Sequence, residues 1–149
     1  MSESKQNRRL HQEKRGLGIE RVSLDESTYS EFLLNTTRYA FAAQYVRSRA
    51  KVLDIACGTG YGIPFFKKAK FLVAADISLD ALKVGKSLYN SSRTTFVQCD
   101  AEYLPFKDAS FDLITSFETI EHLKNPRLFL SELKRCAKPG ARIIISTPN

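Results

Sequence analysis

The chain has 149 residues, of which 43% are hydrophobic and 26% are charged, and its formal net charge at pH 7 is +7. This length and composition predict a globular domain with a hydrophobic core. No apolar run approaches the roughly 20 residues needed to cross a bilayer, so we expect no membrane span. The three cysteines are far apart and form no CxxC pair, which argues against a zinc site and indicates reduced thiols in a cytoplasmic protein.

The N-terminal segment is basic. Residues 1–21 contain six basic and three acidic residues and no apolar core of a secretory signal. We predict a flexible segment over residues 1–24 and a single domain over residues 25–149. The segment is typical of a solvated chain end, and the alternative is that it contacts RNA or an anionic surface.

Helical and strand patterns alternate from residue 28 onward. Thr28 and Glu31 have the spacing of a capping box, which predicts a helix from there to about Arg49. Ser78 is a predicted N-cap, followed by a helix with Ala81, Val84 and Leu88 on one face. A helix predicted from Asn125 has Phe129, Leu130, Leu133 and Ala137 inward and is closed by residues 138–140. The predicted strands are 51–56, 71–75, 94–98, 111–115 and 141–147, and a further helix is predicted over 63–68.

This alternation predicts an α/β fold, a doubly wound parallel sheet with helices on both faces. Ligands of such sheets bind outside the carboxyl ends of the strands. The first strand is followed there by a turn with Gly58, Gly60 and Gly62 and by a predicted helix N-terminus. The third glycine is one residue early for a dinucleotide fingerprint. Asp54 lies inside the strand, which suits a ligand with an ammonium group better than a pyrophosphate and argues against NAD.

Acidic residues follow the next strands as well. Asp76 ends the second strand and Asp100 follows the third, while residues 116–122 follow the fourth. A carboxylate just past the second strand can accept hydrogen bonds from both hydroxyls of a ribose.

Four segments resemble motifs of class I S-adenosylmethionine (SAM) dependent methyltransferases. LDIACGTGYG is similar to the first motif, AADIS to the ribose-binding acid, CDAEYLPFKDASFDLI to the adenine loop and fourth strand, and LKRCAKPGARIIISTPN to the last helix and fifth strand. The resemblance covers about Tyr39 to Asn149. It implies a Rossmann-like sheet of order 3-2-1-4-5 and a SAM-binding methyltransferase domain.

The resemblance also implies cofactor contacts, with S-adenosylhomocysteine as the product. Asp54, Gly58 and Gly60 would hold the methionine end of SAM. Phe117 and Glu118 would lie near the sulfur. Tyr39 would reach the SAM carboxylate or seal the pocket. The remaining implied contacts are Ala56 from the first motif, Asp76 and Ile77 at the ribose, and Asp100 and Ala101 at the adenine.

Two departures from the family pattern lead to expectations. Ala56 stands where glycine is common, and we expect alanine to be tolerated there with a negative φ. The sequence stops after the fifth strand, so we expect either a fragment or a minimal member without the usual final antiparallel hairpin. An uncovered fifth strand is a hydrophobic edge that pairs readily, and we expect a dimer through this edge or completion by a partner.

The stretch SFETIEHL places Glu118, Glu121 and His122 at spacing i, i+3, i+4, so a helical turn would bring them to one face. Two carboxylates and an imidazole can hold a divalent ion, and the pattern resembles that of metal-assisted O-methyltransferases. We favour a role at the cofactor edge and helix entry over a metal site. His122 is the candidate general base, with Glu121 beside it.

We therefore predict a SAM-dependent methyltransferase that acts on a hydroxyl or amine of a small molecule or glycan. One alternative is a SAM-binding module or fragment without catalysis that needs a partner. The other is a metal-assisted enzyme similar to RNA 2′-O-methyltransferases.

Overall fold

The structure is a computed structural model that describes the backbone of residues 26–148 and side chains from residue 33 onward. The chain divides into two compact units, 1–33 and 34–149, and the β-sheet lies in the second. The predicted flexible segment, residues 1–24, lies outside the described residues.

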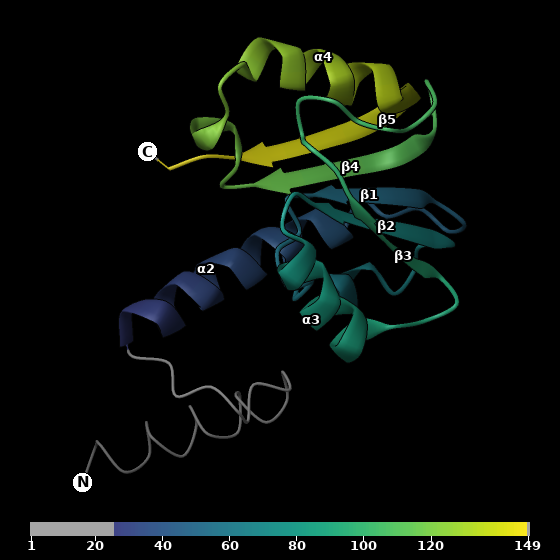
Figure 1. Cartoon of the computed structure of the whole chain (residues 1–149). Helices are drawn as coiled ribbons and strands as arrows, with labels where there is room; N and C mark the ends of the chain where they lie inside the picture. The colour runs from purple at the N-terminus through teal and green to yellow at the C-terminus, as the bar shows by residue number, and fades with distance from the viewer. Residues whose placement is uncertain (1–25, 149) are drawn as a thin grey trace, which may run out of the picture. The chain divides into compact units, whose positions relative to one another are not determined.

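A five-stranded parallel sheet of order β3-β2-β1-β4-β5 forms the centre of this unit (Figure 1). This order and the parallel pairing confirm the predicted doubly wound, Rossmann-like fold. Because all strands run the same way, their carboxyl ends lie at one edge of the sheet and their amino ends at the other. The strands are β1 (Lys51–Ile55), β2 (Phe71–Asp76), β3 (Thr94–Gln98), β4 (Phe111–Phe117) and β5 (Ala137–Ser146).

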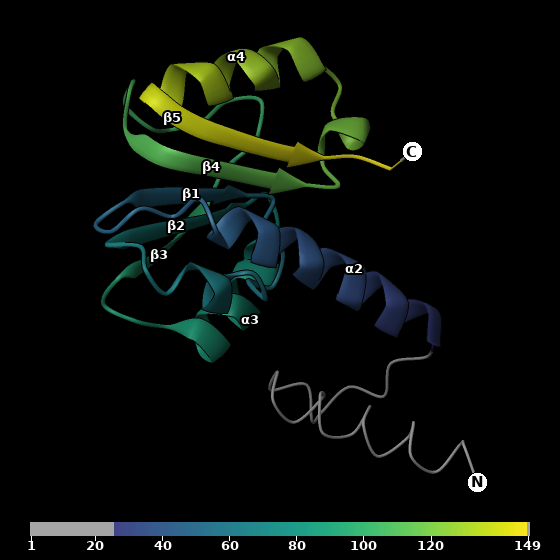
Figure 2. The ribbon, with the colours of Figure 1, turned by 180° about the vertical axis from the view of Figure 1, so that it is seen from behind.

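Helices cover both faces of the sheet (Figure 2). The last part of α2 packs with α3 on one face, and α4 packs on the other. The helical elements are α2 (Glu26–Ala43), the 3₁₀ turn η1 (Ile63–Phe66), α3 (Leu79–Tyr89), the 3₁₀ turn η2 (Ile120–His122) and α4 (Pro126–Cys136). None of the described helices is long and apolar enough to cross a membrane.

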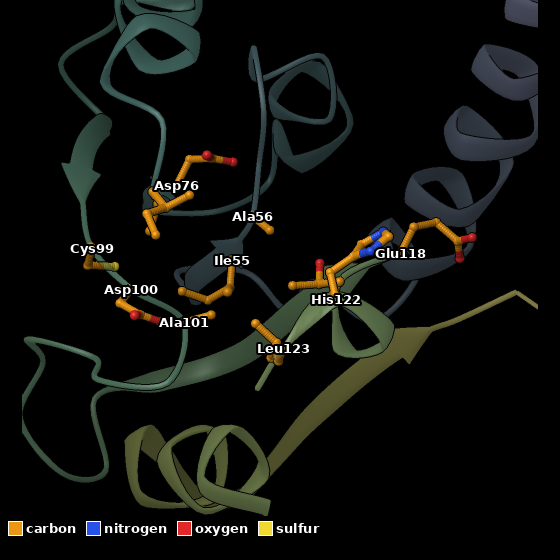
Figure 3. Close-up of a pocket in the computed structure, with 12 residues that line it drawn as sticks. Ile55, Ala56, Asp76, Cys99, Asp100, Ala101, Glu118, His122 and Leu123 are labelled. Atoms are coloured by element: carbon orange, nitrogen blue, oxygen red, sulfur yellow. The ribbon is translucent and has the colours of Figure 1, made fainter. Parts of the chain in front are cut away.

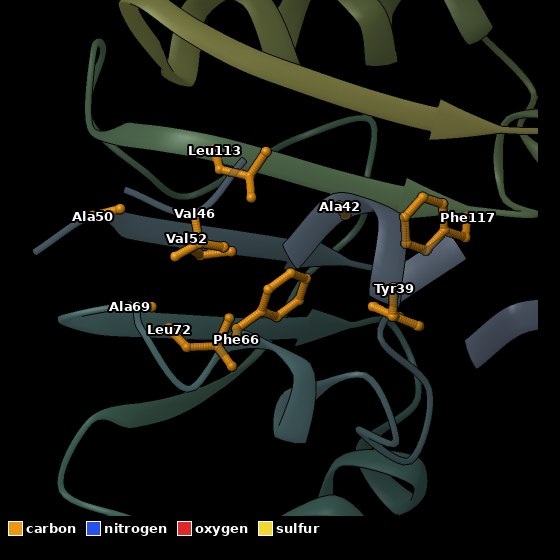
Figure 4. Close-up of a cluster of buried hydrophobic side chains, with 10 residues drawn as sticks. All are labelled: Tyr39, Ala42, Val46, Ala50, Val52, Phe66, Ala69, Leu72, Leu113 and Phe117. Atoms are coloured by element: carbon orange, nitrogen blue, oxygen red, sulfur yellow. The ribbon is translucent and has the colours of Figure 1, made fainter. Parts of the chain in front are cut away.

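Each face of the sheet has its own hydrophobic cluster. In β1, Val52 points to one face and Leu53 to the other, and both are fully buried. The cluster beneath α2 is drawn in Figure 4 and consists of Tyr39, Ala42, Val46, Ala50, Val52, Phe66, Ala69, Leu72, Leu113 and Phe117. The cluster beneath α4 consists of Leu53, Ile55, Ala75, Leu104, Phe111, Ile114, Phe129, Leu133 and Cys136.

Two predicted helices differ from the structure. The helix start predicted from the capping box at Thr28 is wrong, because α2 is already helical at Glu26. The helix also ends at Ala43 rather than at the predicted Arg49. The helix predicted over 63–68 is only the 3₁₀ turn η1. The eight residues 63–70 that return the chain to β2 would span only ~12 Å as an α-helix, less than the ~17 Å length of a five-residue strand, so this segment needs a more extended path.

The two predicted N-caps are confirmed, but the buried faces of both helices differ from prediction. The Ser78 hydroxyl accepts from the Ala81 amide at 3.2 Å, and the Asn125 side chain accepts from the Leu128 amide at 3.1 Å. The face of α3 that is buried carries Leu82 and Gly85, whereas the predicted Val84 and Leu88 are exposed. In α4, Phe129 and Leu133 are buried as predicted, together with Cys136, while Leu130 is exposed and Ala137 already belongs to β5.

Gly85 explains the error in α3. A Cβ at Gly85 would lie 2.9 Å from the carbonyl oxygen of Thr59 and 3.0 Å from the Phe96 ring. Glycine therefore lets α3 approach the Gly-rich turn closely. Because a glycine carries no hydrophobic signal, the periodicity alone selects the wrong face.

β5 begins directly after α4. Residues 138–140, predicted to close the helix, lie in β5 instead, next to an irregularity of register between Phe111 and Leu113. In the described sheet β5 pairs only with β4, so its other edge carries no strand. The dimer through this edge stays a prediction. The three cysteines form no disulfide in the structure.

Arg135 in α4 holds the loop between β3 and β4. Its guanidinium donates to the carbonyl oxygens of Leu104 at 2.9 Å and Phe106 at 2.7 Å. It also makes a bidentate pair with Glu132 at 2.7 and 2.8 Å, and Glu132 in turn accepts from the Leu104 amide at 2.8 Å. This network fixes the irregular loop onto α4.

Replacing Arg135 by lysine should destabilise the fold. Lysine keeps the charge but cannot make the bidentate pair and both carbonyl contacts at once. We expect Arg135→Lys to lower the free energy of unfolding by about 2 kcal/mol, measured by urea denaturation. The exposed neighbour Lys134, replaced by alanine, is the control. A change below about 0.5 kcal/mol for Arg135→Lys would contradict this role of the network.

Candidate functional site

A cavity of about 300 Å³ lies at the carboxyl ends of β1, β2 and β3 and beyond the end of β4 (Figure 3). Its wall is mostly apolar, with a few acidic groups and one imidazole. The lining residues are Ile55, Ala56, Ala75, Asp76, Ile77, Cys99, Asp100, Ala101, Glu118, Thr119, His122 and Leu123. An apolar cavity with a few polar groups at the carboxyl ends of a parallel sheet is the usual form of a small-molecule site.

The edge of the sheet around this cavity is acidic. Residues 76–80, 98–103 and 117–122 together contain six acidic residues and no lysine or arginine. Fixed negative charge of this kind favours a ligand that carries positive charge.

Asp76 connects β2 to the Gly-rich turn. Its carboxylate accepts from the Gly58 amide at 2.7 Å and from the Ser78 amide at 2.8 Å. A carboxylate has about four acceptor positions, so two remain for a ligand. Asp76 therefore has the position and the unused acceptor capacity that the predicted contact to a ribose diol requires.

The three glycines of the turn have different functions. Gly58 and Gly60 have φ of +56° and +79°, a region that favours glycine. Gly62 is required by packing, because a Cβ there would lie 2.1 Å from the Tyr39 ring. Gly58 and Gly60 shape the turn and do not line the cavity.

Ala56 corrects an expectation. Its φ is +56° rather than negative, so an alanine is held in the left-handed region where the family often has glycine. Ala56 lies at the wall of the cavity, directly before the turn.

Asp54 does not line the cavity, and its predicted contact with the methionine end stays a prediction. Its side chain is fully buried and accepts from the Thr115 hydroxyl at 2.7 Å and from the Tyr39 hydroxyl at 3.0 Å. Burial raises the pKa of Asp54 to about 7, although the two hydrogen bonds act in the opposite direction. The structure therefore gives Asp54 the role of joining β1 to α2 and β4.

Tyr39 and Phe117 also lie away from the cavity. Both are buried, and their rings meet edge to face with centroids 4.8 Å apart. Tyr39 packs in addition against Tyr61, Phe65 and Phe66. These aromatic rings pack against one another beside the Gly-rich turn. The predicted contacts of Tyr39 with the SAM carboxylate and of Phe117 with the sulfur region stay predictions.

Glu118, Glu121 and His122 do not converge. Glu118 has φ of +50° at the end of β4, and its carboxylate accepts from Ser146 at 2.8 Å and pairs with Arg38 at 3.0 Å. His122 and Glu121 are 3.9 Å apart, and they belong to the 3₁₀ turn η2 instead of a helical turn that begins at Glu118. Among the residues that the structure describes, no three acidic, histidine or cysteine side chains are placed to hold a metal ion.

The structure brings together about half of the predicted cofactor residues. Those that line the cavity are Ala56, Asp76, Ile77, Asp100, Ala101 and Glu118, together with the candidate base His122. Sequence reasoning missed Ile55, Ala75, Cys99, Thr119 and Leu123. Ala75 and Cys99 directly precede the two acids, so their position at strand ends was the available signal.

Comparisons with known proteins agree with this geometry. A family described as "Methyltransferase domain" matches residues 53–145. Over 109 residues the chain is 38% identical to a demethylmenaquinone methyltransferase of Streptomyces griseus, a match that covers 72% of this chain and 46% of that protein. It is 35% identical over 116 residues to the ubiquinone/menaquinone biosynthesis C-methyltransferase UbiE of Cellvibrio japonicus, with 72% and 47% covered.

A solved structure shares the fold. It is that of a SAM-dependent methyltransferase from Aquifex aeolicus, with a TM-score of 0.66 and 22% identity, and it covers 82% of this chain and 72% of that one. The chain spans about half the length of the curated relatives it matches.

The strained alanine provides a first test of the site. Ala56→Gly removes the left-handed cost of ~1–2 kcal/mol and adds a glycine entropy cost of ~0.5–1 kcal/mol, so a net stabilisation of about 0.5–1 kcal/mol is expected in urea denaturation. The control is Ala75→Gly in the neighbouring strand β2, which should destabilise. Equal destabilisation by both substitutions would show that φ at Ala56 is not positive.

The buried Asp54 predicts a dependence of stability on pH. The folded-state pKa of about 7 lies above the unfolded value near 3.9, so the native state holds the proton more tightly. The resulting stabilisation is fully present below about pH 4 and is lost as the pH rises through about 7.

Urea denaturation of the wild type and Asp54→Asn between pH 4 and pH 8 measures this effect. Asparagine cannot ionise, so the variant should gain stability relative to the wild type by an amount on the order of 3 kcal/mol over this range. A difference between the two proteins that stays constant with pH would contradict the assignment.

Proposed function

Because the chain belongs to the methyltransferase-domain family, we propose that its cavity binds SAM. The chain then forms the cofactor-binding half of an enzyme that transfers the methyl group. The observation that carries the proposal is the position of Asp76, which ends β2 at the cavity with acceptor positions left after its two amide contacts.

The residues present fit this cofactor. The apolar wall formed by Ile77, Ala101 and Leu123 suits the faces of an adenine ring, and Asp100 stands beside it. The carboxylate of Asp76 suits a ribose diol. The surplus of acidic residues at this edge suits a ligand with a sulfonium and an ammonium group.

When bound, SAM supplies an electrophilic methyl group and its own leaving group. The chain then has to align the acceptor with the methyl–sulfur bond and exclude water. Ala56 follows β1 and Glu118 follows β4, and both line the cavity. Both residues have positive φ, which turns the chain at the wall of the cavity. Strained backbone at a site is consistent with a preorganised binding surface.

His122 is the proposed general base for an acceptor that must lose a proton. Its side chain is 77% exposed at the mouth of the cavity, where an acceptor would enter. Glu121 lies 3.9 Å away and can orient the imidazole.

The acceptor is proposed to be a small molecule. The names of the relatives favour methylation of a carbon atom of a demethylated quinone, rather than of the hydroxyl or amine of a small molecule or glycan that the sequence led us to expect. No observation favours the metal-assisted RNA enzyme, because Glu118 is engaged with Arg38 and Ser146.

Calorimetric titration with SAM and S-adenosylhomocysteine tests the cofactor assignment. The wild-type chain should bind both, and Asp76→Asn should bind about 10- to 100-fold more weakly, since a ribose hydroxyl loses its charged acceptor. Asp80→Asn is the matched control, because Asp80 is an exposed acid four residues away.

Thermal unfolding of the same proteins separates binding from folding, since Asp76 also holds the Gly-rich turn. Unchanged affinity in a folded Asp76→Asn variant would contradict the proposed ribose contact. Absence of binding in the folded wild type would contradict the assignment of the cavity. Methyl transfer to demethylmenaquinone is then the reaction to assay.

A further inference from the structure

The amino ends of β1, β2 and β3 form a basic surface, which we call the basic face. It lies at the end of the strands opposite the cavity. The segments that precede these strands, residues 44–51, 67–71 and 90–94, contain seven basic residues and no acidic residue. The seven residues, all exposed, are Arg47, Arg49, Lys51, Lys67, Lys68, Lys70 and Arg93. No ion pair within the described part of the chain involves any of them.

The three segments are neighbours in space. The Lys70 amide donates to the Ala50 carbonyl at 2.8 Å, and the Leu72 amide donates to the Arg93 carbonyl at 2.8 Å. The strands that follow them pair directly, β1 with β2 and β2 with β3 (Figure 2). The seven basic side chains therefore form one continuous surface, which favours a polyanionic partner.

A second cavity, of about 210 Å³, opens in this basic face. Its wall contains the apolar residues Pro64, Phe66 and Leu72, and its polar lining includes Lys67, Asn90 and Arg93. One guanidinium nitrogen of Arg93 donates to the Lys67 carbonyl at 3.0 Å, which holds the group beside the cavity with its other N–H groups available. A flat aromatic group with an attached anion matches this combination of apolar wall and basic rim.

An exposed aromatic ring lies at the amino end of β2. Phe71 begins β2 and is 43% exposed, and the ammonium of Lys70 lies 5.4 Å from its ring centroid. Aromatic rings beside cationic groups provide stacking surfaces for unpaired bases.

We propose that the amino-end face binds a single-stranded nucleic acid, with phosphates on the basic residues, one base in the cavity beside Arg93 and another base on Phe71. A cavity that takes one base requires an unpaired strand, which separates this partner from a duplex and from an anionic membrane. This proposal is independent of the SAM site. The acidic carboxyl edge repels phosphates, so the bound strand stays away from the cavity at the other edge.

Fluorescence anisotropy of the full chain with a labelled 12-nucleotide oligouridylate tests the proposal. With about four phosphates neutralised, log affinity should fall with log salt at a slope near −3, or about eightfold from 100 to 200 mM. The double variant Lys67→Glu/Arg93→Glu should lose at least about tenfold in affinity. The matched control is Lys83→Glu/Lys86→Glu on α3, which changes the net charge equally and should lose clearly less.

Three results would overturn the proposal. One is equal loss of affinity in both double variants, which indicates only a response to net charge. Another is binding that the Lys67/Arg93 variant retains but deletion of residues 1–21 abolishes. The third is a duplex, or vesicles containing an anionic lipid, bound at least as tightly as the single strand.

Discussion

The buried carboxylate of Asp54 is the constraint on which the site depends. It joins three elements, because β1 carries it, α2 donates to it through Tyr39, and β4 donates to it through Thr115. A fully buried carboxylate without a basic partner is costly unless it is hydrogen-bonded or neutral. The same Tyr39 ring occupies the space where a side chain at residue 62 would lie. The position of α2, the third glycine of the turn and the rise in the pKa of Asp54 are thus consequences of one arrangement.

The parallel sheet separates charge between its two edges. Acidic residues follow β2, β3 and β4, and basic residues precede β1, β2 and β3, so the carboxyl ends favour a cationic ligand and the amino ends a polyanion. This separation allows two different partners to bind without competition. It also argues that a nucleic acid held at the amino edge is not the methyl acceptor, since the acceptor must reach the carboxyl edge.

The fold and part of the site were predictable from the sequence. Strand patterns, the caps at Ser78 and Asn125 and the acids at the strand ends are local signals, and the structure bears them out. Contacts across elements were not predictable in the same way. The motif that contains Asp54 does not show that Tyr39 and Thr115 occupy its oxygens, and the spacing of Glu118 and His122 does not show that Glu118 turns toward Arg38. The positive φ of Ala56 depends on the path of the whole turn, for which alanine gives no signal.

We propose that the carboxyl ends of the strands hold SAM beside Asp76 and Asp100. Amide NMR spectra of the isotopically labelled chain, recorded during titration with S-adenosylhomocysteine, test it most directly because they report each residue separately. We expect the largest shift changes at Gly58, Ile77, Ala101 and Thr119, with Lys67 and Arg93 unchanged. Shift changes confined to other residues, or none at all at saturating ligand, would contradict it.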